Sequence, residues 1–392
     1  MRETLYMAWR YLAYNRIKTT QLVLSTTLIL FLPAGLKTLV GRSARALTAR
    51  AEATPLVIGA KGSPLELVLN SLYFESAPPE TIPYAEVARV SGSKLANAIP
   101  LYTRFRARRF PLVGTTIDYF DFRGLSLASG RKMAVLGECV VGSEVAAQLG
   151  IDVGESIVSS PENAFDLAGA YPLKMKVVGV LAPTGTPDDR AVLADLKTAW
   201  VIAGLAHGHQ DMAKPEAAQG VLKREGNTIV ANAAVMQYNE ITPDNIGAFH
   251  FHGDPSTFPI TAVVALPHDQ KSSTLLQGRY LADNERMQAV MPSDVMEELL
   301  RTVLTVQNYF IAGVLVIGLS TLTLSILVFA LSLRLREREI ETMHRIGGSR
   351  HRVAGLLAAE VGVVVVLATG LATVMTLMAG HLGEWLIRMV IL

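Results

Sequence analysis

Three stretches of this chain are apolar over the length of a membrane span. Thr19–Leu36 and Tyr309–Leu333 carry no charged residue, and Val353–Gly380 carries one, Glu360. The hydrocarbon core of a bilayer is crossed by about 20 mostly apolar helical residues. The pattern therefore predicts three transmembrane helices. The first run could instead be the core of a signal peptide, but its length and the missing small-residue cleavage site favour a retained anchor.

The pattern changes between the first two spans, where short β-type runs alternate with turn residues. The β-type runs are TPLVIGA, FPLVGTTI, MAVLGECVVG, LKMKVVGVLAP, NTIVANAAVM and FPITAVVALP, with helical patterns such as SPLELVLNSLY and GSEVAAQLGI between them. This mixture predicts an α+β domain. Turns are expected at Pro187-Asp188 and Gly253-Asp254, with Asp189 and Gly253 in exposed loops. Ser293 is the expected N-cap of a helix that continues into the second span.

Two segments next to the predicted spans, residues 1–18 and 336–350, have amphipathic sequences. In residues 1–18, Leu5, Trp9 and Leu12 recur at helical spacing among basic residues. Such a helix lies along the inner membrane surface; the alternative is a simple extension of the first span.

The charged segment 336–350 separates the last two spans. Ile340, Met343 and Gly347 fall on one helical face, while Arg338, Glu341 and Arg345 face away from it. Glycine accepts the left-handed conformation that ends a helix, and Gly347-Gly348 supplies it. A small apolar face with a charged rim suits a groove on a cytoplasmic partner. The alternative is a solvated loop.

Composition and charge refine this picture. The chain has 392 residues, of which 50% are hydrophobic and 18% charged, as expected for membrane spans joined to a water-facing domain. A net charge of +2 argues against a nucleic-acid-binding protein. The lone cysteine, Cys139, cannot form an intrachain disulfide and is expected to be a buried apolar residue.

Arginines in the charged segment fix the orientation. Six of them lie between the last two spans: Arg334, Arg336, Arg338, Arg345, Arg350 and Arg352. Basic residues in short loops stay in the cytoplasm. We therefore expect a multi-pass membrane protein with a cytoplasmic N-terminus and its large domain outside.

Histidines and one intramembrane acid are the candidates for chemistry. His207, His209, His250 and His252 belong to two H-x-H-x-D stretches, which end at Asp211 and Asp254. On a strand, residues i and i+2 share a face, so the histidines could bind zinc, with the aspartates as ligands or orienting groups; the alternative is chance clustering in polar loops.

Glu360 lies inside a span. Such an acid faces a partner helix or a polar cavity, or snorkels to the nearby cytoplasmic surface. No catalytic triad or paired-carboxylate motif stands out, and G-x-x-x-x-G-K-[ST] does not occur. The chain is therefore not expected to be an enzyme.

Several motifs resemble those of the FtsX/MacB-like permeases of ATP-binding-cassette (ABC) systems, which include lipoprotein-release and macrolide-export permeases. LREREIETMHRIGGSRHRV is similar to their cytoplasmic signature, and LLAAEVGVVVVLATG to the span that follows it. AWRYLAYNRIKTT resembles their first amphipathic helix, and VLGECVVGSEVAAQLGIDVGESI with MKVVGVLAP resembles their outer core domain.

The resemblance implies a separate ABC ATPase subunit that carries ATP and magnesium, and a second permease subunit in a homo- or heterodimer. It also implies that ATP hydrolysis moves the outer domains, to export or extract an envelope substrate. The implied ATPase contact consists of Arg336, Arg338, Glu339, Ile340, Met343, Arg345, Gly347 and Gly348.

Alternatives to transport remain open. One is a mechanotransmitter that carries nothing and switches an extracytoplasmic hydrolase or adaptor. Another is a membrane-anchored metal- or solute-binding module. An extracytoplasmic adaptor or substrate-binding protein is a further candidate partner.

The family has four spans, whereas three are evident here. Either the sequence is truncated, or residues 381–392 lie on the outer surface. The expected segments are an amphipathic cytoplasmic helix at 1–18, a span at 19–40, an α+β domain at 41–300, a stalk end and span at 301–335, a coupling helix at 336–350, a span at 351–380 and a C-terminal segment at 381–392.

Overall fold

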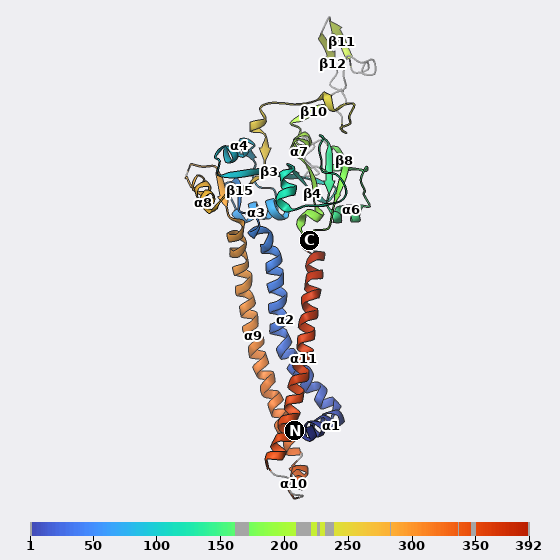
Figure 1. The fold of residues 1–392 in the computed structure, drawn as a ribbon, viewed down its shortest axis with the longest axis vertical. Helices are drawn as coiled ribbons and strands as arrows, with labels where there is room; N and C mark the ends of the chain where they lie inside the picture. Colours follow the sequence, from blue (N-terminus) through green and yellow to red (C-terminus); the bar gives the residue numbers. More distant parts are fainter. Residues whose placement is uncertain are drawn as a thin grey trace. The chain divides into compact units, whose positions relative to one another are not determined.

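The computed structural model describes residues 2–160, 172–208, 221–225, 228–231, 239–282, 284–335, 337–345 and 350–390. Its residues form two compact units (Figure 1). We call residues Met1–Leu47 and Glu298–Ile391 the helical unit, and residues Thr48–Glu297 the sheet unit.

Five helices contribute to the helical unit. They are α1 (Arg2–Tyr14), α2 (Arg16–Glu52), α9 (Pro292–Leu335), α10 (Glu337–Arg345) and α11 (Arg350–Val390). Three of them are long and apolar enough to cross a membrane, over Arg16–Arg42, Pro292–Val328 and His351–His381. Large apolar side chains on these helices are exposed, for example Val316 and Leu319 on α9. That exposure suits a lipid environment, because lipid tails are as apolar as leucine.

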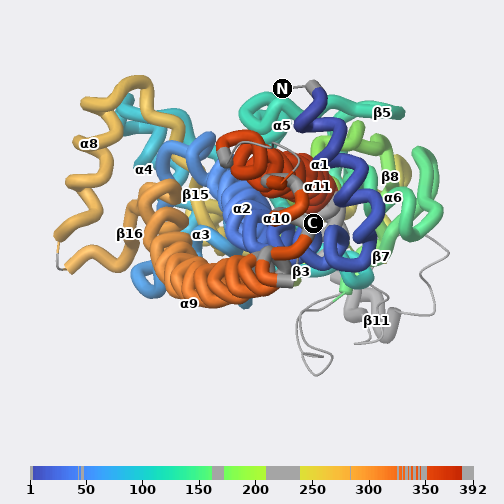
Figure 2. The backbone as a smooth tube through the Cα atoms, turned by 90° about the horizontal axis from the view of Figure 1, so that it is seen from below, coloured from blue at the N-terminus to red at the C-terminus, as the bar shows by residue number. Residues whose placement is uncertain are grey.

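Helix α2 contacts both of the other long helices within this unit (Figure 2). The Thr27 hydroxyl donates to the carbonyl oxygen of Ala368 in α11 at 3.4 Å. On α9, the absent side chain of Gly318 leaves room for Ile29, which would lie 3.3 Å from a Cβ at that position. Small residues therefore allow close packing of these helices.

Helix α9 begins two residues earlier than the sequence predicts. Its first residue is Pro292, so Ser293 lies inside the helix and is not its N-cap. Proline suits the first helical position because the backbone N–H that it lacks has no partner there.

A ten-stranded sheet is the centre of the sheet unit, in the order β16-β1-β15-β3-β4-β9-β6-β8-β5, with β7 pairing β3 and β8. Its strands are β1 (Leu56–Ala60), β3 (Ala96–Ala107), β4 (Phe110–Thr115), β5 (Leu127–Gly130), β6 (Glu138–Val141), β7 (Ser156–Ser160), β8 (Lys174–Leu181), β9 (Val192–Asp195), β15 (Ala262–Pro267) and β16 (Met287–Val290).

Short strand pairs and helices complete the unit. The pairs are β2 (Ile82–Pro83) with β14 (Pro259–Ile260), β10 (Ala206–Gly208) with β13 (Phe249–Phe251), and β11 (Val221–Glu225) with β12 (Thr228–Ala231). The helices are α3 (Pro64–Tyr73), α4 (Ala85–Gly92), α5 (Asp118–Arg123), α6 (Ser143–Leu149), α7 (Leu196–Ile202) and α8 (Gln270–Gly278), with 3-10 turns η1 (Pro187–Arg190), η3 (Ile246–Ala248) and η4 (Pro255–Thr257).

The long strand β3 joins two parts of the sheet. Its first half pairs with β15, which continues to β1 and β16. Its second half pairs with β4 and β7, and the pairings β4-β9, β9-β6, β6-β8 and β8-β7 close six strands into a ring. Closure removes sheet edges that would otherwise be unpaired. One strand therefore belongs to both the ring and the open sheet.

The predicted fold class, three apolar helices with a mixed α+β domain, is confirmed. Two local expectations are wrong. In MAVLGECVVG only Glu138–Val141 forms a strand. The expected turn at Pro187-Asp188 is present as η1, but Asp189, which was expected in an exposed loop, is buried there. The Asp189 carboxylate can be buried because the backbone N–H groups of Thr184 and Gly185 donate hydrogen bonds to it, which replace those to water.

Candidate functional site

Helix α10 is the short charged helix that follows α9 in the chain and precedes α11. Arg338, Glu341 and Arg345 are exposed on it. The guanidinium of Arg345 donates to the Glu341 carboxylate at 2.7 Å, one turn earlier. Glutamate N-terminal to a basic residue at this spacing stabilises a helix by a few tenths of a kcal/mol, about 0.3–0.5.

The other predicted coupling residues are described only in part. Glu339, Ile340 and Met343 lie in the helix, although only their backbone is described. Arg336, Gly347 and Gly348 lie outside the described residues. The described residues therefore show that a charged helix, α10, lies in the chain between two candidate spans.

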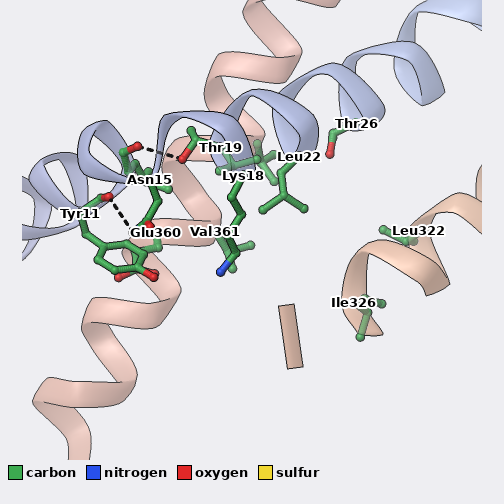
Figure 3. Close-up of a pocket in the computed structure, with 13 residues that line it drawn as sticks. Tyr11, Asn15, Lys18, Thr19, Leu22, Thr26, Leu322, Ile326, Glu360 and Val361 are labelled. Atoms are coloured by element: carbon green, nitrogen blue, oxygen red, sulfur yellow. Dashed lines mark hydrogen bonds between the residues drawn. The ribbon is translucent and has the colours of Figure 1, made fainter. Parts of the chain in front are cut away.

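Glu360 lies in a cavity of the helical unit (Figure 3). Glu360 is 3% exposed, and the cavity has a volume of about 200 Å³. Polar lining residues come from the junction of α1 and α2: Tyr11, Asn15, Lys18 and Thr19. Leu322 and Ile326 of α9 line it as well. The acid therefore lies in a largely apolar cavity of the helix bundle, which the cationic Lys18 also lines.

The last turn of α2 carries a buried arginine that is bound by the sheet unit. Arg50 donates through Nη1 and Nη2 to the two carboxylate oxygens of Asp188, at 2.6 and 3.0 Å. Nη2 also donates to the Tyr119 hydroxyl at 2.8 Å, and Nε donates to the Leu72 carbonyl oxygen. The carboxylate further accepts from the hydroxyls of Tyr119 and Thr186. Both charges are therefore fully paired away from water.

Electrostatics of this cluster favour the charged forms of the ion pair. Burial alone would raise the pKa of Asp188, but the charge and hydrogen bonds of Arg50 hold it below its ordinary value. Burial would likewise lower the pKa of Arg50, yet Asp188 raises it. Burial and the Asp188 carboxylate raise the pKa of Tyr119 to about 12, so its phenol stays neutral. No sequence pattern predicted this cluster, because its members lie 69 and 138 residues from Arg50.

Three of the four predicted histidines come together in the sheet unit. One nitrogen of each of His207, His250 and His252 lies within 4.8 Å of the others. His209 and Asp211 lie outside the described residues. Asp254 is not part of this group, because its carboxylate caps η4 by accepting from the backbone N–H of Ser256 at 2.9 Å.

Cys139 is a buried residue of β6, as the sequence predicts. Burial, with a smaller contribution from the charge of Glu138, raises the pKa of its thiol. The thiolate is the reactive form of cysteine, so this side chain is chemically inert.

Most of the residues that match a known protein family lie in the sheet unit. The model of the MacB-like periplasmic core domain family matches residues 42–237, half of the chain. The periplasmic region of MacB from Actinobacillus actinomycetemcomitans is similar over 64% of this chain and 95% of its own, with 11% identity and a TM-score of 0.35. The extracellular domain of the ABC-type transporter YknZ from Gram-positive bacteria is similar over 60% and 98%, with 12% identity and a TM-score of 0.33. No curated protein matches the sequence.

Proposed function

This chain belongs to the MacB-like family of ABC transporter permeases, and from that membership we propose that it couples ATP hydrolysis by a separate subunit to movement of its extracytoplasmic sheet unit. The working assembly in this proposal is two permease subunits and two ATPase subunits in the bacterial cytoplasmic membrane. The sheet units act on an envelope substrate, which is exported or extracted.

Helix α10 is the observation that carries the proposal. It connects two candidate spans, and its described charged side chains are exposed. Its sequence places Ile340 and Met343 on one face, and Thr342 on the opposite face. A helix that is held by a span on either side does not need an apolar face for membrane anchoring. A groove on a cytoplasmic ATPase explains that face better.

Helix α2 supplies a route from the membrane to the sheet unit. Its last residues, including Arg50, belong to the sheet unit, while the rest belongs to the helical unit. Arg50 is held by Asp188 of η1 and Tyr119 of α5. Because breaking a buried ion pair is costly, displacement of this helix end would carry η1 and α5 with it. The buried pair is therefore the proposed mechanical joint.

A matched pair of substitutions in α10 tests the proposal. Met343→Asp puts a carboxylate into the proposed groove, where an unpaired buried charge costs on the order of several kcal/mol. Thr342→Asp adds the same charge to the opposite face. We expect Met343→Asp to abolish co-purification with the ATPase and the permease-dependent stimulation of ATP hydrolysis. Thr342→Asp should retain both.

Membrane insertion serves as the control for both variants, which should reach the membrane in equal amounts. Equal complex yield and equal ATPase stimulation for Met343→Asp and the unmodified protein would refute the docking role of α10.

A further inference from the structure

We propose that His207, His250 and His252 form a site for a divalent transition-metal ion on the sheet unit, with three imidazole ligands and an open coordination position. Each residue offers one ring nitrogen, and these nitrogens lie within 4.8 Å of one another. The proposal is independent of the ATPase coupling, because it rests on side chains of a different unit.

Strand register explains why the three histidines share one face. His207 of β10 is the direct antiparallel partner of His250 in β13. Residues that face each other across a strand pair project to the same side, and so do residues two apart on one strand. The backbone N–H of His252 donates to the Leu205 carbonyl oxygen at 3.0 Å, which extends the pairing beyond β13. A slip of one residue would separate the imidazoles.

Nitrogen spacing matches that of a tetrahedral metal centre. The Nε2 atoms of His207 and His252 are 3.3 Å apart. Zinc–nitrogen bonds of 2.0–2.1 Å at tetrahedral angles separate two ligand nitrogens by about 3.3 Å. The nitrogen of His250 lies within 4.8 Å of the other two and has to approach to the same spacing. It can do so by rotation of an exposed side chain, since the outer torsion of histidine is broad.

A backbone carbonyl is placed to orient His250. Nδ1 of its ring lies 3.2 Å from the Ala248 carbonyl oxygen, to which it can donate a hydrogen bond. In the neutral imidazole that bond leaves the lone pair on Nε2 for a metal. Metal-bound histidines usually donate their second ring N–H to a carbonyl or carboxylate in this way.

The opposite face of β13 is fixed by aromatic packing. Phe251 packs edge-on against Trp200 with ring centroids 6.5 Å apart, and both contact Phe258. A Cβ at Gly208 would lie 2.7 Å from the ring of Phe249, so this glycine lets β10 approach β13 closely. The alternation of Phe and His from Phe249 to His252 therefore packs one side against aromatic rings and presents the imidazoles on the other.

Ligand chemistry selects the class of metal. Imidazole nitrogen suits zinc, copper, nickel and cobalt, whereas magnesium and calcium require oxygen ligands. Three histidines with solvent access leave room for water or another ligand at the remaining position. A zinc-class ion with one exchangeable position is therefore the expected occupant.

Metal titration of the full-length protein in detergent tests the site. The protein is purified through a tag without histidine, stripped with chelator and titrated with Zn²⁺ by calorimetry. We expect one site per chain, and at least about a tenfold loss of affinity in His207→Ala/His252→Ala, because even orienting groups around a metal contribute about 10–100-fold. His268→Ala, an exposed histidine outside the cluster, should bind as the unmodified protein does.

Cobalt provides a readout that does not depend on variants. Co²⁺ bound to the unmodified protein should give the visible absorption of a tetrahedral centre, and Zn²⁺ should displace it. Absence of stoichiometric metal, or equal affinity in the cluster and His268 variants, would overturn the proposal. An octahedral cobalt spectrum would overturn it as well, because the proposal requires a tetrahedral centre with one open position.

Discussion

The Arg50–Asp188 and Arg345–Glu341 ion pairs are almost equally short, at 2.6 and 2.7 Å, but their surroundings differ completely. In the sheet unit the two side chains are 7% and 1% exposed. In α10 they are 77% and 60% exposed. Distance is therefore a poor guide to what an ion pair contributes.

Burial decides the contribution of each pair. Charges removed from water depend on their partner, and loss of one partner costs about 3–5 kcal/mol. An exposed pair contributes at most about 1 kcal/mol, because water solvates both groups once the pair is broken. The buried pair is accordingly a structural joint, while the exposed charges of α10 remain available to a partner.

The largest expected effect is that of Asp188→Asn. The substitution leaves the Arg50 guanidinium buried without its counter-charge, and should lower the free energy of unfolding of the sheet unit by about 3–5 kcal/mol. Asp121→Asn is the matched control, because Asp121 pairs with Lys132 at 2.6 Å while its side chain is 73% exposed. It should cost about 1 kcal/mol or less. Urea unfolding of the full chain in detergent, followed by proteolysis, measures both, and equal losses would remove the distinction.

The free energy of unfolding at acidic pH should also depend on the buried carboxylate of Asp188. The folded-state pKa of Asp188 lies below its unfolded value, so its stabilising contribution is complete above about pH 4 and is lost as the pH falls through the folded pKa. One carboxylate contributes a slope of at most about 1.4 kcal/mol per pH unit. Glu138, whose pKa is lowered by its hydrogen bond with Arg131, has the same sign. The urea midpoint should therefore decline as the pH falls below about 4, by roughly these slopes.

Asp188→Asn isolates the contribution of one residue to that decline. Its pH profile should be flatter than that of the unmodified protein. Parallel profiles for the unmodified protein and Asp188→Asn would show that the buried carboxylate does not titrate differently in the folded state.

Arg345→Ala should have the smallest effect. It removes the exposed pair with Glu341 and is expected to cost about 0.5 kcal/mol or less. Thermal unfolding of the purified permease should therefore be unchanged within about a degree or two. A loss comparable to that of Asp188→Asn would mean that α10 has a structural role inside this chain.

Sequence patterns predicted elements whose residues act locally. The apolar runs gave the three long helices, and LVIGA and AVVALP in the β-type runs gave β1 and β15. The central strand β3 was not predicted, because Pro100 interrupts its pattern and proline disfavours a central strand. It is tolerated in β3 because the strand pairs on either side still satisfy the neighbouring backbone groups.

Candidate sites were predictable where register brings repeated residues together. The two H-x-H spacings pointed to four histidines, and pairing of β13 with β10 brings His207, His250 and His252 together. The residues that line the cavity of Glu360 and the partners of Arg50 could not be predicted. Each comes from an element distant in the chain, and a single Tyr, Lys or Asp carries no periodic signal of its contact.

Cross-linking in cells tests the central claim, coupling through α10, most directly. A photoreactive amino acid is placed at Met343 and, as a control on the sheet unit, at Asp121. The account predicts that Met343 yields an adduct with a chain that carries G-x-x-x-x-G-K-[ST], identified by mass spectrometry, and that Asp121 does not. Capture of that ATPase from Asp121, or no such adduct from Met343 in a permease that co-purifies with it, would contradict the claim.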